Sequence, residues 1–497
     1  MTKIYYKAIE IEYIIKEKVY LMRCLDIAVV GSGIGGSLIA SLSSQCTKKD
    51  VVLFEKDKNL GGCASTFTRF GNRYNTGATT LVGYEQGHIL KEQFDAIGLQ
   101  PDISKSEIAI RVIQNNKSID RVKDFDTFLE SINTLYPNPK NTLFWSRLKE
   151  LDEIFWRLKN IYYVKYSLQS YVKIAFFVAK LVSIYGSSLF KSAESFINET
   201  LGNISLEYRD FIDSQLLITI QTTSKEISLL SLALGLSYPF HDVFYVNGGM
   251  GTLIQDIVKD IEVKKNETIV KVLKDSNDWI IRSTKDEYRV KNLILNASIY
   301  QNSTLFEDKE IKKYYNHFSF SDQSAFVVYL IIDTEKEFLE HYQFIYEKLL
   351  PNSISKSFFV SFSKQSDAIL SKKGLSVTIS THTKAMIWKN MEKVKYEYEK
   401  QRTQDYIIKK FLEYFTTIKQ KNILKCFSAT SATFNRYIGR TNCGGKAIHM
   451  KNLTQLPSCK TPFKGLYNVG DTIFAGQGWP GVALGVDVLS KEINASS

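Results

Sequence analysis

The sequence contains few prolines, and its cysteines are too scattered for a disulfide framework. Only 8 prolines and 27 glycines occur among 497 residues, which leaves little room for disordered linkers. The 6 cysteines form no CxxC pair, so neither a disulfide scaffold nor a common zinc site is expected. Cys443, His449 and Cys459 have a spacing that fits no common metal site, and we therefore predict that the chain binds no metal.

The sequence also lacks runs of basic residues, although its formal net charge is +12. The excess lysines are spread singly along the chain and are not gathered among aromatic residues, so we predict no nucleic-acid partner. A net positive charge is compatible with binding to a membrane surface, because each lysine near anionic headgroups contributes about 1 kcal/mol of attraction.

A long uninterrupted apolar run is missing as well. The stretch 171–185, YVKIAFFVAKLVSIY, is shorter than the ~20 residues needed to cross a bilayer. Its two lysines, Lys173 and Lys180, share one helix face, which suits a helix lying in the membrane surface and suits a core helix equally well.

The N-terminal residues 1–21 show no secretory signal, because acids and lysines interrupt their apolar residues. We expect a cytoplasmic protein, with peripheral attachment to the inner face of the membrane if 171–185 lies in its surface. Met22 is an alternative start of translation, and residues 1–21 are otherwise a short amphipathic extension.

Apolar residues make up 44% of the chain and aromatic residues 13%, which indicates a folded protein with an aromatic-rich cavity or surface. The length is about twice that at which a single core stops growing, so two or more connected domains are expected.

The most informative segment, 26–62, reads DIAVVGSGIGGSLIASLSSQCTKKDVVLFEKDKNLGG and predicts a dinucleotide-binding βαβ unit. An apolar strand at 27–30 leads into a glycine turn and a helix. Gly31 permits the turn, Gly33 lets the backbone approach a pyrophosphate, and Gly36 lets the helix pack against the strand. The first helical residues, Ile34 and Gly35, present free N–H groups to the anion.

A second strand, 51–54, ends at Glu55, which is placed to accept hydrogen bonds from the adenosine ribose, with Lys56 beside it. Gly61 and Gly62 follow, and this extension is similar to the longer fingerprint of two-domain FAD enzymes. A second interpretation, that this glycine pair only turns the chain, stays open. FAD is the predicted cofactor.

Two later segments look like further parts of the same cofactor site. In 241–300 a glycine-rich turn precedes a helix, and short strands follow that contain Val270 and end at Asn296. At the C-terminus a strand at 466–469 leads to Gly470 and Asp471, whose carboxylate suits the ribityl chain. The helix that begins near Gly481 and Val482 would point its N–H groups at the flavin N1 and O2 region.

The intervening segments predict a second domain inserted into the first, and the fold class is α/β. A Rossmann-like FAD-binding domain is built from 22–100, 241–300 and 421–497, after the extension 1–21. The insertion 101–240 is predicted to be mainly helical and to face the substrate or membrane, whereas 301–420 carries a β-sheet and a long charged helix. Together the two insertions form an interleaved α+β substrate domain.

Four blocks of the chain resemble the phytoene desaturase and carotenoid isomerase family of FAD-dependent oxidoreductases, which belongs to the amine-oxidase-like flavoproteins. They are GGCASTFTRFGNRYNTGATTLVG (61–83), YVNGGMGTL (245–253), SATFNRYIGR (431–440) and GLYNVGDTIFAGQGWPGVALG (465–485). The resemblance implies noncovalent FAD, peripheral membrane attachment and an apolar tunnel for a polyene. Within the blocks it makes Arg69, Gly77 and Arg436 candidate cofactor contacts. Tyr74 and Asn75 depart from the Phe and Asp common in the family.

The resemblance implies desaturation or cis/trans isomerisation of a long conjugated isoprenoid, a carotenoid or its precursor. The alternatives are a flavin-dependent saturase, an amine oxidase, and a non-catalytic escort protein that binds isoprenoid lipids. The intact glycines and Glu55 disfavour the escort protein. Neither main reaction needs a catalytic histidine or cysteine, so no catalytic residue is predicted, and His241 is the histidine to test first.

Overall fold

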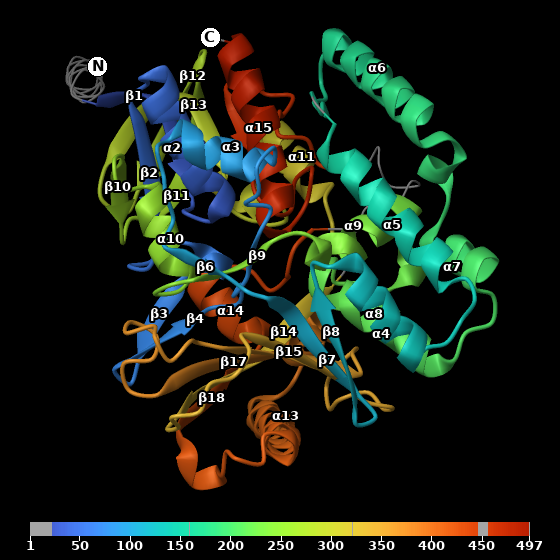
Figure 1. The fold of residues 1–497 in the computed structure, drawn as a ribbon. Helices are drawn as coiled ribbons and strands as arrows, with labels where there is room; N and C mark the ends of the chain where they lie inside the picture. Colours follow the sequence, from blue (N-terminus) through green and yellow to red (C-terminus); the bar gives the residue numbers. More distant parts are fainter. Residues whose placement is uncertain (1–21, 159, 321, 446–455, 497) are drawn as a thin grey trace, which may run out of the picture.

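The computed structural model describes residues 22–158, 160–320, 322–445 and 456–496. Figure 1 shows three regions, which are a Rossmann-like sheet with its helices, a group of helices beside it, and a second sheet below both. The expectations for residues 1–21 and for His449 fall outside the described residues.

The first sheet has seven strands and holds the glycine turn at its centre. β1 pairs in parallel with β2 on one side and with β13 on the other, and β10 and β19 extend the parallel part. β11 and β12 add an antiparallel hairpin beside β13. The strands are β1 (Arg23–Val30), β2 (Val51–Glu55), β10 (Glu262–Lys265), β11 (Ile269–Asp275), β12 (Asp278–Ser283), β13 (Glu287–Leu295) and β19 (Leu466–Asn468).

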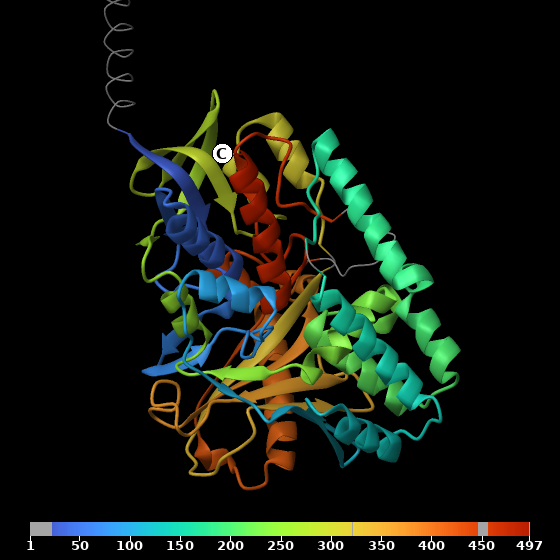
Figure 2. The same ribbon diagram turned by 45° about the horizontal axis from the view of Figure 1, so that its top comes forward.

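Helices from all three predicted segments cover this sheet. α2 packs against both α15 and α10, and α15 also packs against α3 (Figure 2). The inner strands β1 and β2 are almost entirely buried, as is typical of parallel strands covered on both faces. The helices are α2 (Ile34–Thr47), α3 (Ile89–Ala96), α10 (Met250–Ile257), α11 (Lys309–Asn316) and α15 (Gly478–Ser496). The sheet and its helices thus come from separate parts of the chain, and they depart from the predicted bounds in two places. α11 belongs to 301–420 but packs here, whereas β18 (Ile423–Ala429) belongs to 421–497 but lies in the second sheet.

The second sheet is also seven-stranded, in the order β18-β14-β17-β16-β15-β7-β8. Ile407 and Phe411 of α13 belong to the same buried cluster as Val328 and Leu330 of the sheet, and this cluster is a separate core. The strands are β7 (Ile108–Gln114), β8 (Lys117–Val122), β14 (Gln323–Ile332), β15 (His341–Ile345), β16 (Ser357–Phe362), β17 (Leu375–Lys384) and β18 (Ile423–Ala429). The helices are α12 (Ala385–Lys389), α13 (Lys393–Tyr414) and α14 (Ser431–Ile438).

The insertion 101–240 starts with strands before its helices begin. β7 and β8 join the second sheet, where β7 pairs in parallel with β15 from the other insertion. The two insertions thus share one sheet, and a core of aromatic and aliphatic residues joins the helices behind it. The helices are α4 (Phe125–Leu135), α5 (Asn141–Trp156), α6 (Leu168–Tyr185), α7 (Ala193–Leu201), α8 (Leu206–Thr219) and α9 (Leu229–Ser237).

Two small sheets connect these regions. β3 (Thr66–Arg69) pairs with β4 (Asn72–Asn75), and β9 (Val243–Val246) lies between β5 (Leu81–Val82) and β6 (Ile103–Lys105). Short 3-10 turns complete the chain at η1 (Gly62–Ala64), η2 (Gly186–Phe190), η3 (Ser224–Glu226), η4 (Tyr238–Phe240), η5 (Asn302–Leu305) and η6 (Gln420–Asn422).

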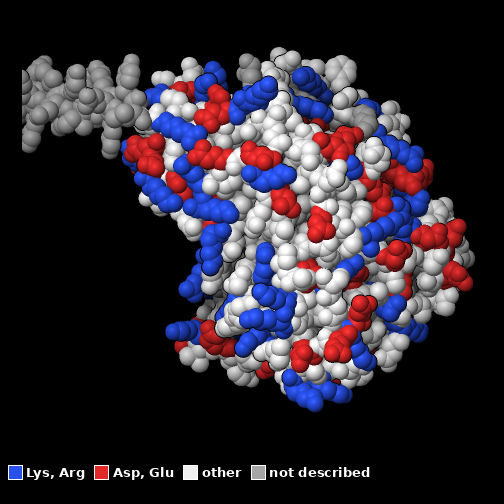
Figure 3. Space-filling model, turned by 60° about the vertical axis from the view of Figure 1, so that its left-hand side comes forward, with Lys and Arg blue, Asp and Glu red and all other residues white. Residues whose placement is uncertain are grey.

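The surface agrees with the dispersed charge of the sequence. On the face shown in Figure 3, basic and acidic side chains are both spread over the molecule. Several of the basic residues are paired, as in the contacts of Arg23 with Asp50 and Glu262. The absence of a nucleic-acid partner stays a prediction.

Candidate functional site

A large cavity with a volume of about 1730 Å³ lies between the first sheet, the helical region and the second sheet. Its wall contains the turn after β1, the end of β2, the end of β13 and the segment before α15. Most of the predicted cofactor contacts line it, namely Gly31, Gly33, Ile34, Gly35, Glu55, Lys56, Gly62, Arg69, Gly77, Asn296, Gly470, Asp471, Gly481 and Val482.

The glycine turn forms an anion cradle at one end of the cavity. Gly31 has φ +99°, which favours glycine, and a Cβ at Gly36 would lie 2.0 Å from the Gly31 carbonyl oxygen. Gly33 caps α2 without a side-chain hydrogen bond, so the first N–H groups of the helix are left for a ligand. A negatively charged diphosphate fits this donor set.

Glu55 is held rigidly at the end of β2. Its Oε2 accepts hydrogen bonds from the N–H and the hydroxyl of Ser32, at 2.9 and 2.6 Å, and its Oε1 accepts one from the N–H of Asp57 at 2.9 Å. Lys56 also lines the cavity, and burial lowers the pKa of its ammonium group. A fixed carboxylate beside a cation suits a ribose followed by a phosphate.

Asn296 joins the three segments of the site. Its Nδ2 donates a hydrogen bond of 3.0 Å to the Gly31 carbonyl oxygen. Added Cβ atoms at Gly33 and Gly470 would lie 2.7 and 2.8 Å from its side-chain amide. The end of β13 therefore holds the turn after β1 and the turn after β19 together.

Replacing Asn296 with alanine is expected to weaken flavin retention and to destabilise the fold by roughly 1–3 kcal/mol, because the Gly31 carbonyl loses its partner. Chemical denaturation and the flavin content of the purified protein measure the two effects. Asn292→Ala is the matched control. Asn292 lies on β13 and donates a hydrogen bond of 3.3 Å to the Asp26 carbonyl oxygen, outside the cavity. An equal loss in both variants would contradict the role of Asn296.

Asp471 is paired with a residue that the sequence analysis did not single out. Its Oδ1 accepts a hydrogen bond of 2.9 Å from Nη1 of Arg440, whose Nε donates 2.9 Å to the Asn442 carbonyl. Burial lowers the pKa of Arg440, but Asp471 outweighs that effect and the pKa lies above its usual value. Arg440 lies at the end of the block SATFNRYIGR, which was the available signal.

Several candidates lie outside the cavity wall. The Val270 side chain is 52% exposed, while its neighbour Ile269 is buried and lines the cavity, because successive strand residues point to opposite faces. Arg436 is exposed and stacks on Tyr437. Gly36 lies beneath the turn as a packing position. Arg69, by contrast, lines the cavity beside Phe427, with its guanidinium 4.2 Å from the ring centroid.

His241 also lies away from the main cavity, in a cluster of charged groups described below. His241 is near the glycine block 248–251 in sequence, but the chain turns at His241 before β9 begins, so the two do not share a site. His241 is therefore not a candidate base for a substrate in this cavity.

The far end of the cavity is apolar. The inner face of α6 supplies Ile174, Phe177, Val178 and Leu181, and α9 supplies Leu230 and Leu234. Burial lowers the pKa of His382 to about 4, so this wall residue is neutral at pH 7. Lys165 also lines the wall, and its ammonium group donates a hydrogen bond of 2.8 Å to the Leu456 carbonyl oxygen.

Comparisons with known proteins agree with this geometry. Residues 29–97 match the NAD(P)-binding Rossmann-like domain family. The chain is 22% identical to a chloroplast prolycopene isomerase of Daucus carota and 20% identical to that of Arabidopsis thaliana, over 92% of this chain and 78% and 80% of theirs. A shorter match, 36% identical over 73 residues, links 15% of this chain to 12% of the human all-trans-retinol 13,14-reductase.

Solved structures show the same fold over most of the chain. An oxidoreductase of Methanosarcina mazei superposes with a TM-score of 0.63 at 17% identity, covering 94% of this chain and 100% of that one. Putrescine oxidase with bound putrescine gives a TM-score of 0.62 at 14% identity, covering 95% and 98%. At these identities the neighbours show that this chain shares their fold.

Proposed function

We propose that this chain is an FAD-dependent oxidoreductase of the amine-oxidase-like superfamily and that it isomerises cis double bonds of a long conjugated isoprenoid. The observation that carries the proposal is the continuity of the cavity, which runs from the anion cradle of α2 to the apolar wall of α6 and α9. A dinucleotide and a long apolar molecule can therefore meet in one space.

The residues at the cofactor end fit FAD. The cradle at Gly31 and Gly33 would hold the diphosphate, and Glu55 would hold the adenosine ribose. FAD, when bound, supplies the electron exchange that lowers the double-bond character of a polyene. The apolar wall orients the substrate and excludes water, and neutral His382 adds no charge beside it.

Isomerisation is favoured over desaturation because the relatives that cover most of the chain are prolycopene isomerases. Isomerisation leaves the composition of the polyene unchanged and needs no final electron acceptor. Desaturation removes two hydrogen atoms and requires one, and saturation adds two hydrogen atoms.

The purified protein tests the proposal. Its visible spectrum should show a flavin, and incubation with a poly-cis carotenoid in liposomes should give a product of unchanged mass with a different chromatographic retention and absorption spectrum. A product lighter or heavier by two hydrogen atoms would replace isomerisation by desaturation or saturation. Reduction of the flavin by amines, with an unchanged polyene, would instead identify an amine oxidase. Protein that neither contains nor takes up FAD would favour an escort function.

We also propose that α6 docks on a membrane surface and admits the substrate from it. The apolar segment Leu168–Phe190 has 23 residues, so it is longer than the stretch 171–185, and by length and composition it could cross a membrane. Its outer residues Leu168 and Phe176 are 84% and 75% exposed, and its inner residues line the cavity. One helix face thus suits lipid and the other suits substrate.

Two adjacent phenylalanines separate these roles. Phe176→Asp should reduce pelleting with anionic liposomes by roughly 10–100-fold, because a buried Phe contributes about 1.5–3 kcal/mol. Phe177→Asp should leave pelleting largely intact and reduce polyene turnover, since Phe177 lines the cavity. Tyr398→Asp on α13 is the control, as Tyr398 is 65% exposed on a distant helix. Equal pelleting of the Phe176→Asp variant and the wild type would contradict docking through α6.

A further inference from the structure

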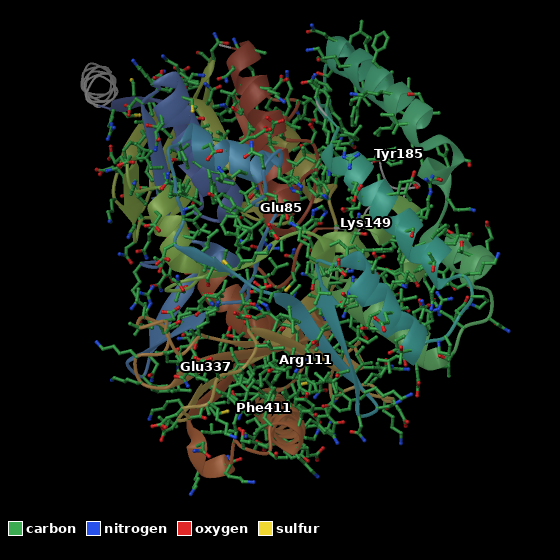
Figure 4. The ribbon with its side chains drawn as sticks, viewed as in Figure 1. Glu85, Arg111, Lys149, Tyr185, Glu337 and Phe411 are labelled. Atoms are coloured by element: carbon green, nitrogen blue, oxygen red, sulfur yellow. The ribbon has the colours of Figure 1, made fainter. Side chains whose placement is uncertain are left out.

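Two histidines and a glutamate lie together outside the main cavity. Glu85, His88 and His241 each offer one ligand atom, and these atoms lie within 4.8 Å of one another. All three side chains are largely shielded and line a second cleft, whose walls also contain residues of α5. Figure 4 shows Glu85 between the Rossmann-like region and the helices.

Neighbouring groups hold Glu85 so that one oxygen faces both imidazoles. Its Oε1 accepts hydrogen bonds from the Lys123 ammonium group at 2.8 Å and from the N–H of Asp242. Its Oε2 lies 3.4 Å from Nδ1 of His241 and 4.0 Å from Nε2 of His88. A tetrahedral ion with bonds of about 2.0–2.2 Å holds two ligands about 3.3–3.6 Å apart. The separation between Glu85 and His241 matches this range, and His88 would move closer to them when the ion binds.

Contacts with α5 fix the orientation of both imidazole rings. Nε2 of His241 lies 2.5 Å from Oδ2 of Asp152, which leaves Nδ1 turned toward Glu85. A carboxylate on the far nitrogen of a histidine is the arrangement that orients metal-ligating histidines. His88 stacks on Trp156 with ring centroids 5.2 Å apart, and its buried Nδ1 has no hydrogen-bond partner among the described residues.

We propose that Glu85, His88 and His241 bind one divalent transition-metal ion of the Zn²⁺ class. Oε2 of Glu85, Nε2 of His88 and Nδ1 of His241 are the ligands, and water from the cleft completes the coordination. Asp152 is a positioning residue that orients His241. This differs from the prediction of no metal, which rested on the spacing of Cys443, His449 and Cys459. The three ligands proposed here come from two distant segments, and their spacing matches no common metal motif.

The ion would fasten the cavity wall to the Rossmann-like domain. Glu85 and His88 precede α3, His241 precedes β9, and Asp152 and Trp156 lie on α5. Trp156 lines both the second cleft and the main cavity. The ion therefore joins three segments at the point where the helical region meets the substrate space. This inference does not depend on the identity of the substrate.

Metal-stripped full-length protein titrated with Co²⁺ tests the site. Wild-type protein should bind one ion per chain, with visible bands of a four- or five-coordinate N/O site, and its Tm should rise. Asp152→Asn keeps the shape of the residue and should weaken binding by roughly 10–100-fold. His88→Ala and His241→Ala should lose the bands, whereas His317→Ala removes an exposed histidine elsewhere and should keep them. Circular dichroism reports whether each variant folds.

The competing explanation is a metal-free ion-pair cluster. Burial lowers the pKa of His241, but its contacts with Asp152 and Glu85 outweigh burial and raise the pKa to about 9. In that case wild-type protein shows no Co²⁺ bands, or shows bands that persist in the folded Asp152→Asn and His88→Ala variants. Either result overturns the proposal.

Discussion

Gly36→Ala is expected to produce protein that retains no flavin. The added Cβ would lie 2.0 Å from the Gly31 carbonyl oxygen and 2.9 Å from Nδ2 of Asn296. The first contact is with backbone, which cannot rotate away, so α2 must move off β1 and the cradle must open. Overpacking of a close-packed interior costs about 1–3 kcal/mol, and a backbone clash lies at or above the upper end. The flavin absorbance per chain measures the effect.

A matched glycine separates the clash from the general effect of alanine. Gly98 has φ +63° and no atom within 4 Å of an added Cβ, so Gly98→Ala should cost only about 1–2 kcal/mol of backbone strain. Its flavin content should stay at the wild-type level. Normal flavin content in Gly36→Ala would mean that α2 does not approach β1 as closely as the structure shows.

Arg440→Ala should be the second most damaging change, because it leaves Asp471 without its cationic partner in the wall of the cavity. Removal of one member of a buried ion pair costs about 3–5 kcal/mol, and the cost here should lie near the lower end because the Asp471 side chain is 27% exposed. We expect a lower free energy of unfolding, measured with urea, and reduced flavin retention.

The double variant Arg440→Ala with Asp471→Asn provides the internal test. Because it removes both charges, it should be more stable than Arg440→Ala alone. Arg289→Ala is the surface control, since the Arg289 pair with Asp275 is partly exposed and worth about 1 kcal/mol or less. If the double variant is less stable than Arg440→Ala, the ion pair is not the reason for the loss.

The sequence by itself predicted the Rossmann-like fold, because the signals that carry it are local. The strand at 27–30, the glycines at 31, 33 and 36, and Glu55 at the end of the next strand lie within one continuous βαβ unit. Glycine spacing and strand length are sufficient to predict this unit, because its backbone conformation depends on residues that are neighbours in the chain. The sequence likewise predicted mainly helical structure in 101–240 and a long charged helix in 301–420, where the structure has α13.

The tertiary structure alone decided which distant residues meet. The pairing of β7 with β15 merges the two insertions into one sheet, and the pair of Arg440 with Asp471 joins two C-terminal segments. The outward direction of Val270 and the cluster around His241 also follow from long-range packing. These contacts depend on how separate elements bury their apolar faces, and hydrophobic periodicity defines those faces without naming the partner that covers each one.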